Sequence, residues 1–163
     1  MTAAARPAVA SDLNVLVGLY RSLESEMTAL SSMWPKTSGL AEPVGESMAG
    51  IVESSMSAGD DHVVLGTYDG YPFGLMYGKV STMLPQAGGE LLGSIRLVFV
   101  EREARAVGVG EAMRDHMLAW FRARGATLHD AHVLPGHRLA KNFFESGGFS
   151  ARHIVMHHDD TDD

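Results

Sequence analysis

A glycine-rich turn between an apolar strand and an amphipathic helix is the feature that most constrains this sequence. Residues 95–100 are apolar except for Arg96, which is typical of a central strand buried on both faces. From Val109 to Phe121, apolar residues recur at helical spacing. The turn between the two, residues 105–110, has the sequence Arg-Ala-Val-Gly-Val-Gly. This joint predicts a strand–turn–helix unit and favours the α/β class.

The start of such a helix favours an anion. Its first N–H groups have no partner within the helix, and the helix dipole adds about half a positive charge. Glycines let a ligand approach the backbone closely, and Arg105 adds a cation that suits phosphate. A pyrophosphate is the ligand that this combination predicts.

Two other glycine-rich sites are excluded by the residues that follow. A P-loop requires Lys-Ser/Thr after its glycines, but Gly110 is followed by Glu111 and Ala112. A dinucleotide-binding turn requires Gly or Ala three positions after Gly110, where Met113 stands. That turn also belongs near the start of its fold rather than after six elements.

Composition narrows the function classes further. The 163 residues suit one domain, and the absence of cysteine excludes disulfides, thiolate metal sites and a cysteine nucleophile. Acidic residues outnumber basic ones by 20 to 13, which argues against non-specific nucleic-acid binding and suits a cationic substrate. No apolar run approaches a membrane span and the first ten residues are no signal peptide, so we expect a cytoplasmic protein.

Periodicity and turn signals predict ten elements in the order β-α-α-β-β-β-α-β-α-β. Ser11 is expected to cap the first helix, and Asp69-Gly70 to turn a hairpin. The predicted strands are residues 4–10, 62–68, 71–80, 90–100, 127–134 and 149–158, and the predicted helices are residues 13–30, 43–56, 109–124 and 138–146.

Two segments together resemble the GNAT superfamily of acetyl-CoA-dependent N-acetyltransferases. Residues 105–110 match its motif Arg/Gln-x-x-Gly-x-Gly/Ala at the same strand–loop–helix joint. Residues 137–149 resemble its motif Asn-x-x-Ala-x-x-Phe-Tyr-x-x-x-Gly-Phe, with Ala140, Phe143, Gly148 and Phe149 at matching positions. The motifs cover about the C-terminal half specifically, while the N-terminal half agrees by element order.

The resemblance implies one domain, residues 1–158, of mixed α/β (α+β) class, followed by a disordered acidic tail, residues 159–163. It implies a mixed central sheet of six to seven strands flanked by about four helices. The fourth and fifth strands would splay apart, and the pantetheine arm of acetyl-CoA would pair with the backbone in that slot. A backbone N–H near Val100 would stabilise the oxyanion. The implied cosubstrate-binding residues are Val98, Phe99, Val100, Arg105, Ala106, Val107, Gly108, Val109, Gly110, Glu111, His137 and Phe144.

Two positions depart from the second motif. His137 stands where the superfamily usually has Asn, and Phe144 stands where its usual general acid, Tyr, would protonate the departing thiolate. Phenylalanine has no proton to donate, so Phe144→Tyr is expected to raise turnover if that proton limits the reaction. His137 either supplies the proton instead or is a helix-entry histidine at the surface.

The general base has two candidates. Glu90 either acts through water from the start of its strand or is an exposed strand-end residue. His132 either reaches the acyl site from the fifth strand or is a buried, hydrogen-bonded histidine.

Two residues are candidates for the acceptor side. Arg96 in a buried strand either binds a substrate carboxylate or pairs with an internal acid, and the internal pair is favoured. Trp34 either covers the acceptor site or anchors its own loop. His129 and His132 point to opposite faces of a strand, so no metal site is expected.

The sequence therefore predicts an enzyme that transfers an acetyl group from acetyl-CoA to a primary amine of a small molecule or peptide, by direct attack. The alternative is an acyl-CoA-binding sensor or interaction module with weak turnover on the same fold. No nucleic-acid or membrane partner is expected, and the final strand with its bare sheet edge allows a homodimer. The identity of the amine is not encoded in any motif of the chain.

Overall fold

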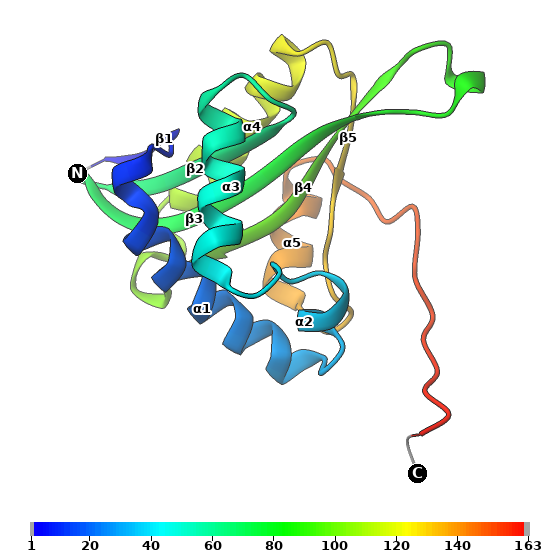
Figure 1. The fold of residues 1–163 in the computed structure, drawn as a ribbon, viewed down its shortest axis with the longest axis horizontal. Helices are drawn as coiled ribbons and strands as arrows, with labels where there is room; N and C mark the ends of the chain where they lie inside the picture. The colour runs from blue at the N-terminus through cyan, green and yellow to red at the C-terminus, as the bar shows by residue number, and fades with distance from the viewer. Residues whose placement is uncertain (1, 162–163) are drawn as a thin grey trace.

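One five-stranded mixed sheet organises the computed structural model, which describes residues 2–161 (Figure 1). Its order follows the sequence, and each strand pairs antiparallel with the next except β4 and β5, which are parallel. The strands are β1 (Ala3–Pro7), β2 (Asp61–Tyr68), β3 (Tyr71–Thr82), β4 (Leu91–Val100) and β5 (Leu128–Ala131).

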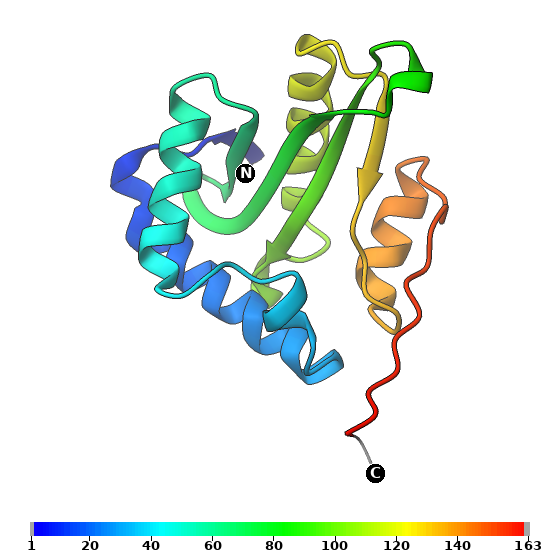
Figure 2. The ribbon, with the colours of Figure 1, turned by 45° about the vertical axis from the view of Figure 1, so that its right-hand side comes forward.

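Helices cover both faces of this sheet, with a separate apolar core on each face (Figure 2). Side chains of α1 and α3 fill one core, and those of α4 and α5 fill the other. The helices are α1 (Leu13–Leu30), α2 (Trp34–Thr37), α3 (Val44–Met56), α4 (Val109–Ala123) and α5 (Arg138–Ser146). None of the described helices is long and apolar enough to cross a membrane.

The start of α1 differs from the predicted cap at Ser11. A short 3-10 turn, Ala10–Asp12, precedes the helix, and Asp12 rather than Ser11 fixes it. The Asp12 carboxylate accepts a hydrogen bond from the Val9 N–H at 2.9 Å and pairs with Arg6 at 2.7 Å. The buried carboxylate thereby ties β1 to the helix.

The prediction of six to seven strands is wrong for the described chain. Residues 149–158, expected to be a final strand, have no backbone hydrogen bond to a sheet neighbour within residues 2–161. The Phe149 N–H donates to the Phe144 carbonyl and closes the turn after α5. The segment is β-prone in sequence, but a strand requires a partner edge, and this one extends past β5 in an exposed arm (Figure 2). Of the predicted acidic tail, Asp162 and Asp163 lie outside the described residues.

A β-bulge in β4 changes which side chains and backbone groups face each way. Tyr77 pairs with Leu97 and Gly78 pairs with Ile95, so Arg96 is the extra residue. One extra residue reverses the alternation beyond it. Ile95 and Val98 consequently pack toward α4, while Leu97 and Phe99 pack toward α1.

Candidate cofactor-binding site

The sheet opens where β4 passes the bulge. Pairing between β4 and β5 begins at Leu92 with Leu128 and ends at Ile95 with Ala131, followed by one hydrogen bond from the His132 N–H to the Ile95 carbonyl. Beyond it the two strands separate, as the ribbon in Figure 2 shows. The Glu101 N–H donates to Phe73 on β3, so the alternate residues Val98 and Val100 direct their backbone groups toward the open side.

A cavity of about 180 Å³ lies at this opening. It is bounded by the end of β4, the turn that follows, the first turn of α4 and one side of α5. The lining residues are Glu26, Val98, Phe99, Val100, Ala104, Arg105, Ala106, Gly110, Glu111, His137, Leu139, Ala140 and Phe143. Eight of the residues expected at the cosubstrate, from three separate segments, therefore line one cavity.

The turn into α4 presents its N–H groups without protein partners. Within the described chain, the amides of residues 106–111 donate to no backbone or side-chain acceptor, and the first helical bond runs from Ala112 to the Gly108 carbonyl. Ala106 and Gly108 have positive φ, 67° and 98°. Left-handed residues in such a turn direct successive N–H groups into one concavity, which suits an anion. Since Ala106 has a side chain, its conformation is strained.

Arg105 is held at the edge of the cavity by three contacts. Its Nε donates to the Val100 carbonyl at 2.8 Å, and its Nη2 donates to Glu26 at 3.1 and 3.3 Å. The guanidinium also lies over the Phe99 ring, 5.7 Å from its centroid. Arg105 is thus fixed rather than free, and Glu26 of α1 is a lining residue that sequence reasoning missed.

His137 lines the same cavity at the start of α5. Burial lowers the pKa of its imidazole below the ordinary value, opposed by the nearby Glu26 carboxylate and assisted by Arg105. The side chain is therefore neutral at pH 7 and able to accept a proton.

No protein-family model matches the chain, and no curated protein matches its sequence. Solved structures do match it over nearly its whole length. A GCN5-related N-acetyltransferase from Ralstonia eutropha superposes with a TM-score of 0.71 at 16% identity, over 97% of this chain and 99% of that chain. The chain has the GNAT fold.

Two further matches with this fold have different names. AAC(6')-Iy, solved with a bisubstrate analogue of CoA and acetylneamine, gives a TM-score of 0.74 at 14% identity, covering 98% of each chain. A transcriptional regulator from Bacillus halodurans gives a TM-score of 0.74 at 17% identity, covering 97% of this chain and 99% of that chain. At these identities the likeness establishes the fold and leaves the activity to be tested.

Phe144 does not occupy the place expected of it in this GNAT fold. It is 3% exposed, packs edge-on against Phe143 and Phe149, and belongs to the core beneath α4. Phe143 lines the cavity instead, and a Cβ at Gly110 would stand 3.2 Å from its ring. Gly110 therefore serves the packing of α4 against α5 as well as the turn.

Three other residues expected at the cosubstrate lie outside the cavity lining. Val109 is fully buried in the core, whereas Val107 is exposed. Gly108 supplies the left-handed turn. For these residues, only the backbone N–H remains available to a ligand.

Neither predicted general base lines the cavity. Glu90 is exposed and precedes the opposite end of β4, and ten residues of strand, roughly 30 Å, separate it from Val100. His132 follows the end of β5 and is exposed as a whole residue. Partial burial of its ring and the charge of Arg96 lower its pKa. Glu90 therefore does not border this cavity, and its role as general base stays a prediction.

Arg96 and Trp34 also differ from expectation. The bulge turns Arg96 out of the sheet, so it is exposed and needs no internal acid. Trp34 is 5% exposed in the core under α1, tilted against Tyr20 with centroids 6.2 Å apart. It anchors α2 and forms no surface over an acceptor.

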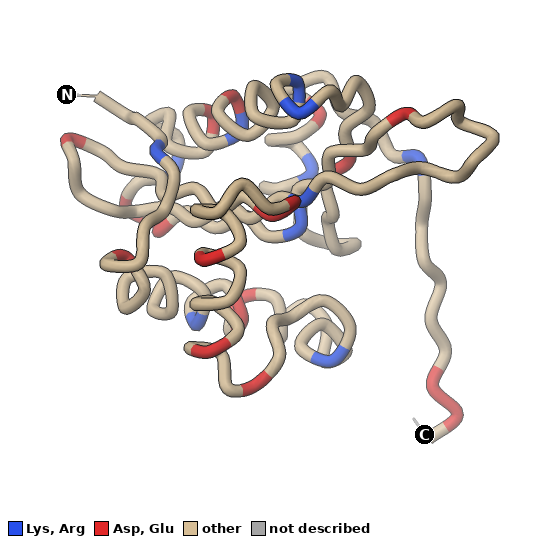
Figure 3. Tube along the Cα trace, turned by 45° about the horizontal axis from the view of Figure 1, so that its top comes forward, with Lys and Arg blue, Asp and Glu red and all other residues tan. Residues whose placement is uncertain are grey.

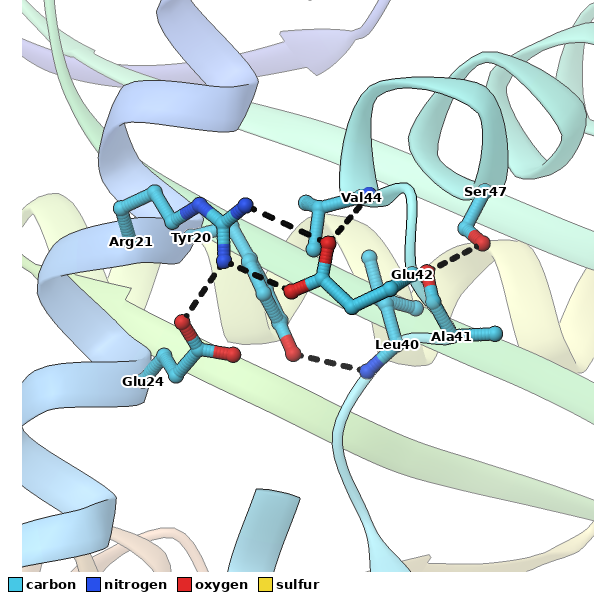
Figure 4. A network of polar contacts seen from close by, with 8 residues as sticks. All are labelled: Tyr20, Arg21, Glu24, Leu40, Ala41, Glu42, Val44 and Ser47. Carbon is cyan, nitrogen blue, oxygen red and sulfur yellow. Dashed lines mark hydrogen bonds and ion pairs between the residues drawn. The ribbon is translucent and has the colours of Figure 1, made fainter. Parts of the chain in front are cut away.

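A second hollow of about 390 Å³ lies on the outer side of α1, lined by Arg21, Glu24, Ser25, Thr28, Ala29 and Pro35. Its charged groups are already matched, because Arg21 donates to Glu24 at 2.9 Å and to Glu42 at 3.0 Å (Figure 4). The same network fixes the chain before α3, where the Tyr20 hydroxyl accepts from the Leu40 N–H at 2.7 Å. This hollow is shallow, and among the described residues that line it there is no set of unpaired backbone donors like that of residues 106–111.

Charge elsewhere is mixed in sign. Along the described chain, basic and acidic residues alternate and form no continuous basic band (Figure 3). Among residues 2–161, no group of three acidic or histidine side chains is close enough to hold a metal ion.

Proposed function

We propose that this protein is an N-acetyltransferase that transfers the acetyl group of acetyl-CoA to a primary amine. The observation that carries the proposal is the set of unpartnered amides at residues 106–111, beside a cavity that opens between β4 and β5. Solved proteins with this fold include one named as a complex with a CoA bisubstrate analogue, which supports the same ligand class here.

The chain's own groups account for the binding of each part of the cosubstrate. The amides of residues 106–111 and the helix dipole of α4 hold the diphosphate, with Arg105 at its edge. The open backbone edge at Val98 and Val100 pairs with the pantetheine arm as an added strand would. One acceptor on that edge, the Val100 carbonyl, is already bonded to Arg105.

The reaction needs an activated acyl group, an oriented amine and a place for its proton. Acetyl-CoA would supply the thioester: the amine nitrogen would bond to the carbonyl carbon, whose oxygen takes up the negative charge, and the carbon–sulfur bond would then break to release the thiolate. An N–H on the open edge of β4, at Val98 or Val100, is directed to stabilise the oxyanion. His137, neutral in the cavity, accepts the amine proton and returns it to the leaving thiolate.

One observation favours a second candidate, an acyl-CoA-binding sensor. The usual tyrosine position is a phenylalanine buried in the core, and one matching structure is named as a transcriptional regulator. In that case CoA binds but no acceptor accelerates its release.

A thiol-release assay with a panel of amines separates the two candidates. The panel includes aminoglycosides, polyamines, amino acids and peptide N-termini, each with acetyl-CoA and purified protein. Amine-dependent CoA release supports the transferase, and His137→Gln should lower it at least tenfold. Tight CoA binding without release by any amine would support the sensor.

We further propose a homodimer. The outer edge of β5 pairs with no strand among the described residues, and the arm beside it exposes Ile154, Val155 and Met156 by 67, 78 and 88%. An unpaired edge next to an exposed apolar segment favours association with a second copy. Light scattering on the purified protein should give twice the mass of one chain, and Val155→Asp should return it to the monomer mass.

A further inference from the structure

Glu26 places a carboxylate in a cavity that the proposed function assigns to an anion. The residue comes from α1, 79 positions before Arg105, and both side chains line the cavity. They are partly buried, with side chains 24 and 27% exposed, so solvent screens the pair less than an ion pair at the surface. Such a carboxylate opposes the binding of a diphosphate.

The contacts of Arg105 indicate what Glu26 does. Nε is bonded to the Val100 carbonyl, and Nη2 is bonded to both oxygens of Glu26. Nη1 donates to no protein acceptor within residues 2–161. A phosphate that bound Arg105 in the two-pronged geometry that guanidinium favours would use Nη1 together with one N–H of Nη2, and its charge would then lie beside the Glu26 carboxylate on the same nitrogen.

We propose that Glu26 is an internal competitor for Arg105, which sets the affinity of the cavity for CoA. This inference rests on the proposed function of the cavity. Before CoA binds, Glu26 neutralises the guanidinium. When the diphosphate binds, Arg105 exchanges its Glu26 contact for a phosphate oxygen, and the Val100 contact keeps the side chain in place. Glu26 therefore acts on the ligand through Arg105.

Calorimetric titration of CoA into the full-length protein tests this proposal. Glu26→Gln removes the charge while keeping the shape, and we expect it to tighten CoA binding about 3- to 5-fold, the range that an ion pair of modest strength supports. Glu24→Gln is the matched control, because Glu24 lies on the same helix and pairs with Arg21 outside this cavity. It should leave CoA affinity unchanged. Unchanged or weaker binding by Glu26→Gln would overturn the proposal.

A double variant separates competition from simple charge repulsion. In the Arg105→Gln background, Glu26→Gln should no longer tighten CoA binding, because the pair that it breaks is already absent. An equal gain in both backgrounds would refute competition. Glu26→Asp keeps the charge but shortens the reach, and a smaller gain is expected from it, which keeps the test available if Glu26→Gln does not fold.

The two levels of inference fail differently. If the wild-type protein binds no CoA, the proposed function fails. If wild-type protein binds CoA and Glu26→Gln has the same affinity, only the role of Glu26 fails.

Discussion

The polar groups at the two ends of α4 differ in whether they have hydrogen-bond partners within the protein. At the N-terminal end, six amides have no protein acceptor among the described residues, and the neighbouring arginine retains an unused nitrogen. Toward the C-terminal end, Arg124 donates to the Gly59 carbonyl at 2.9 Å and to Asp60 at 3.0 Å, and lies 5.0 Å over the Trp120 ring.

In the middle of α4, His116 pairs with His62 of β2. Nε2 of His62 and Nε2 of His116 are 3.0 Å apart, with rings only 4° from parallel. The Ser55 Oγ accepts from the Val63 N–H at 3.0 Å and lies 3.4 Å from His62 Nδ1. With both rings neutral, one Nε2 donates and the other accepts across this contact.

The difference teaches how to separate fold from function in one helix. Polar groups that satisfy each other, as at His62 and His116, hold α3, β2 and α4 together. Donors that have no protein partner at the start of a helix beside a cavity are free to bind an anion, so they mark the candidate site. Variants at the N-terminal end of α4, where the amides are unpaired, should change the affinity for CoA. Variants at the paired residues His62, His116 and Arg124 should change the stability of the fold.

Charge reversal at Arg105 tests the N-terminal end of α4 with the largest expected effect. Arg105→Glu replaces a phosphate donor by an anion, and we expect CoA affinity to fall about 100-fold or more. Calorimetry measures the affinity, with circular dichroism to confirm folding. Arg102→Glu makes the same charge change on an exposed residue outside the cavity lining and should cost far less. Equal losses in both variants would assign the effect to net charge.

Phe144→Tyr tests the border between cavity and core. Because Phe144 is buried among aromatic rings, an added hydroxyl is left without a partner, and the free energy of unfolding should fall by about 1–3 kcal/mol. Turnover should not rise, contrary to the expectation from sequence. Phe143→Tyr is the control, since that ring borders the cavity and its hydroxyl can reach solvent. A stable, faster Phe144→Tyr enzyme would show that the ring reaches the cosubstrate.

Acid should weaken the pairing of His62 with His116. Burial, the His116 ring and Arg124 lower the pKa of His62 to about 4, and burial lowers the pKa of His116. Both folded values lie below the ordinary histidine pKa, so their stabilisation is present above about pH 6.5 and is lost as the pH falls toward 4. Between pH 7.5 and 5, chemical denaturation should show a loss of about 1 kcal/mol, reduced for solvent screening.

The same titration on a double variant sharpens this comparison. His62→Gln with His116→Gln removes both titrating rings, so the loss between pH 7.5 and 5 should shrink. An unchanged slope would place the acid sensitivity in other groups.

Ala106→Gly has the smallest expected effect. Glycine relieves the positive φ of Ala106 but adds freedom to the unfolded chain, so stability should change by no more than about 1 kcal/mol. CoA affinity should stay within a few-fold, because the same amides remain. Thermal unfolding and calorimetry measure the two quantities. A large loss of affinity would mean that the Ala106 side chain itself contacts the ligand.

The local elements of the fold could be predicted from sequence. The periodic apolar residues predicted that α4 begins at Val109, as it does, and helix α5 has the predicted bounds, 138–146. The Asp69-Gly70 turn signal correctly predicted the hairpin of β2 and β3. These signals lie within short stretches of chain, so no distant contact was needed to interpret them.

What failed depends on contacts between distant residues. The pairing of Glu26 with Arg105 and that of His62 with His116 join residues 79 and 54 positions apart, and no local pattern indicates them. The bulge at Arg96 exposes a side chain that was predicted to be buried, because alternation in sequence does not reveal an extra residue. The final strand was predicted from composition, although strand formation depends on a partner edge.

Amide chemical shifts during a CoA titration test the central claim most directly, because they report on the N–H groups themselves. With the backbone assigned, CoA should shift the amides of residues 106–111 more than any others. Pantetheine, which lacks the diphosphate, should leave those six amides nearly unchanged while it shifts Val98 and Val100. Saturating CoA that leaves residues 106–111 unmoved, or shifts mainly the hollow beside Arg21, would contradict the diphosphate cradle at the start of α4.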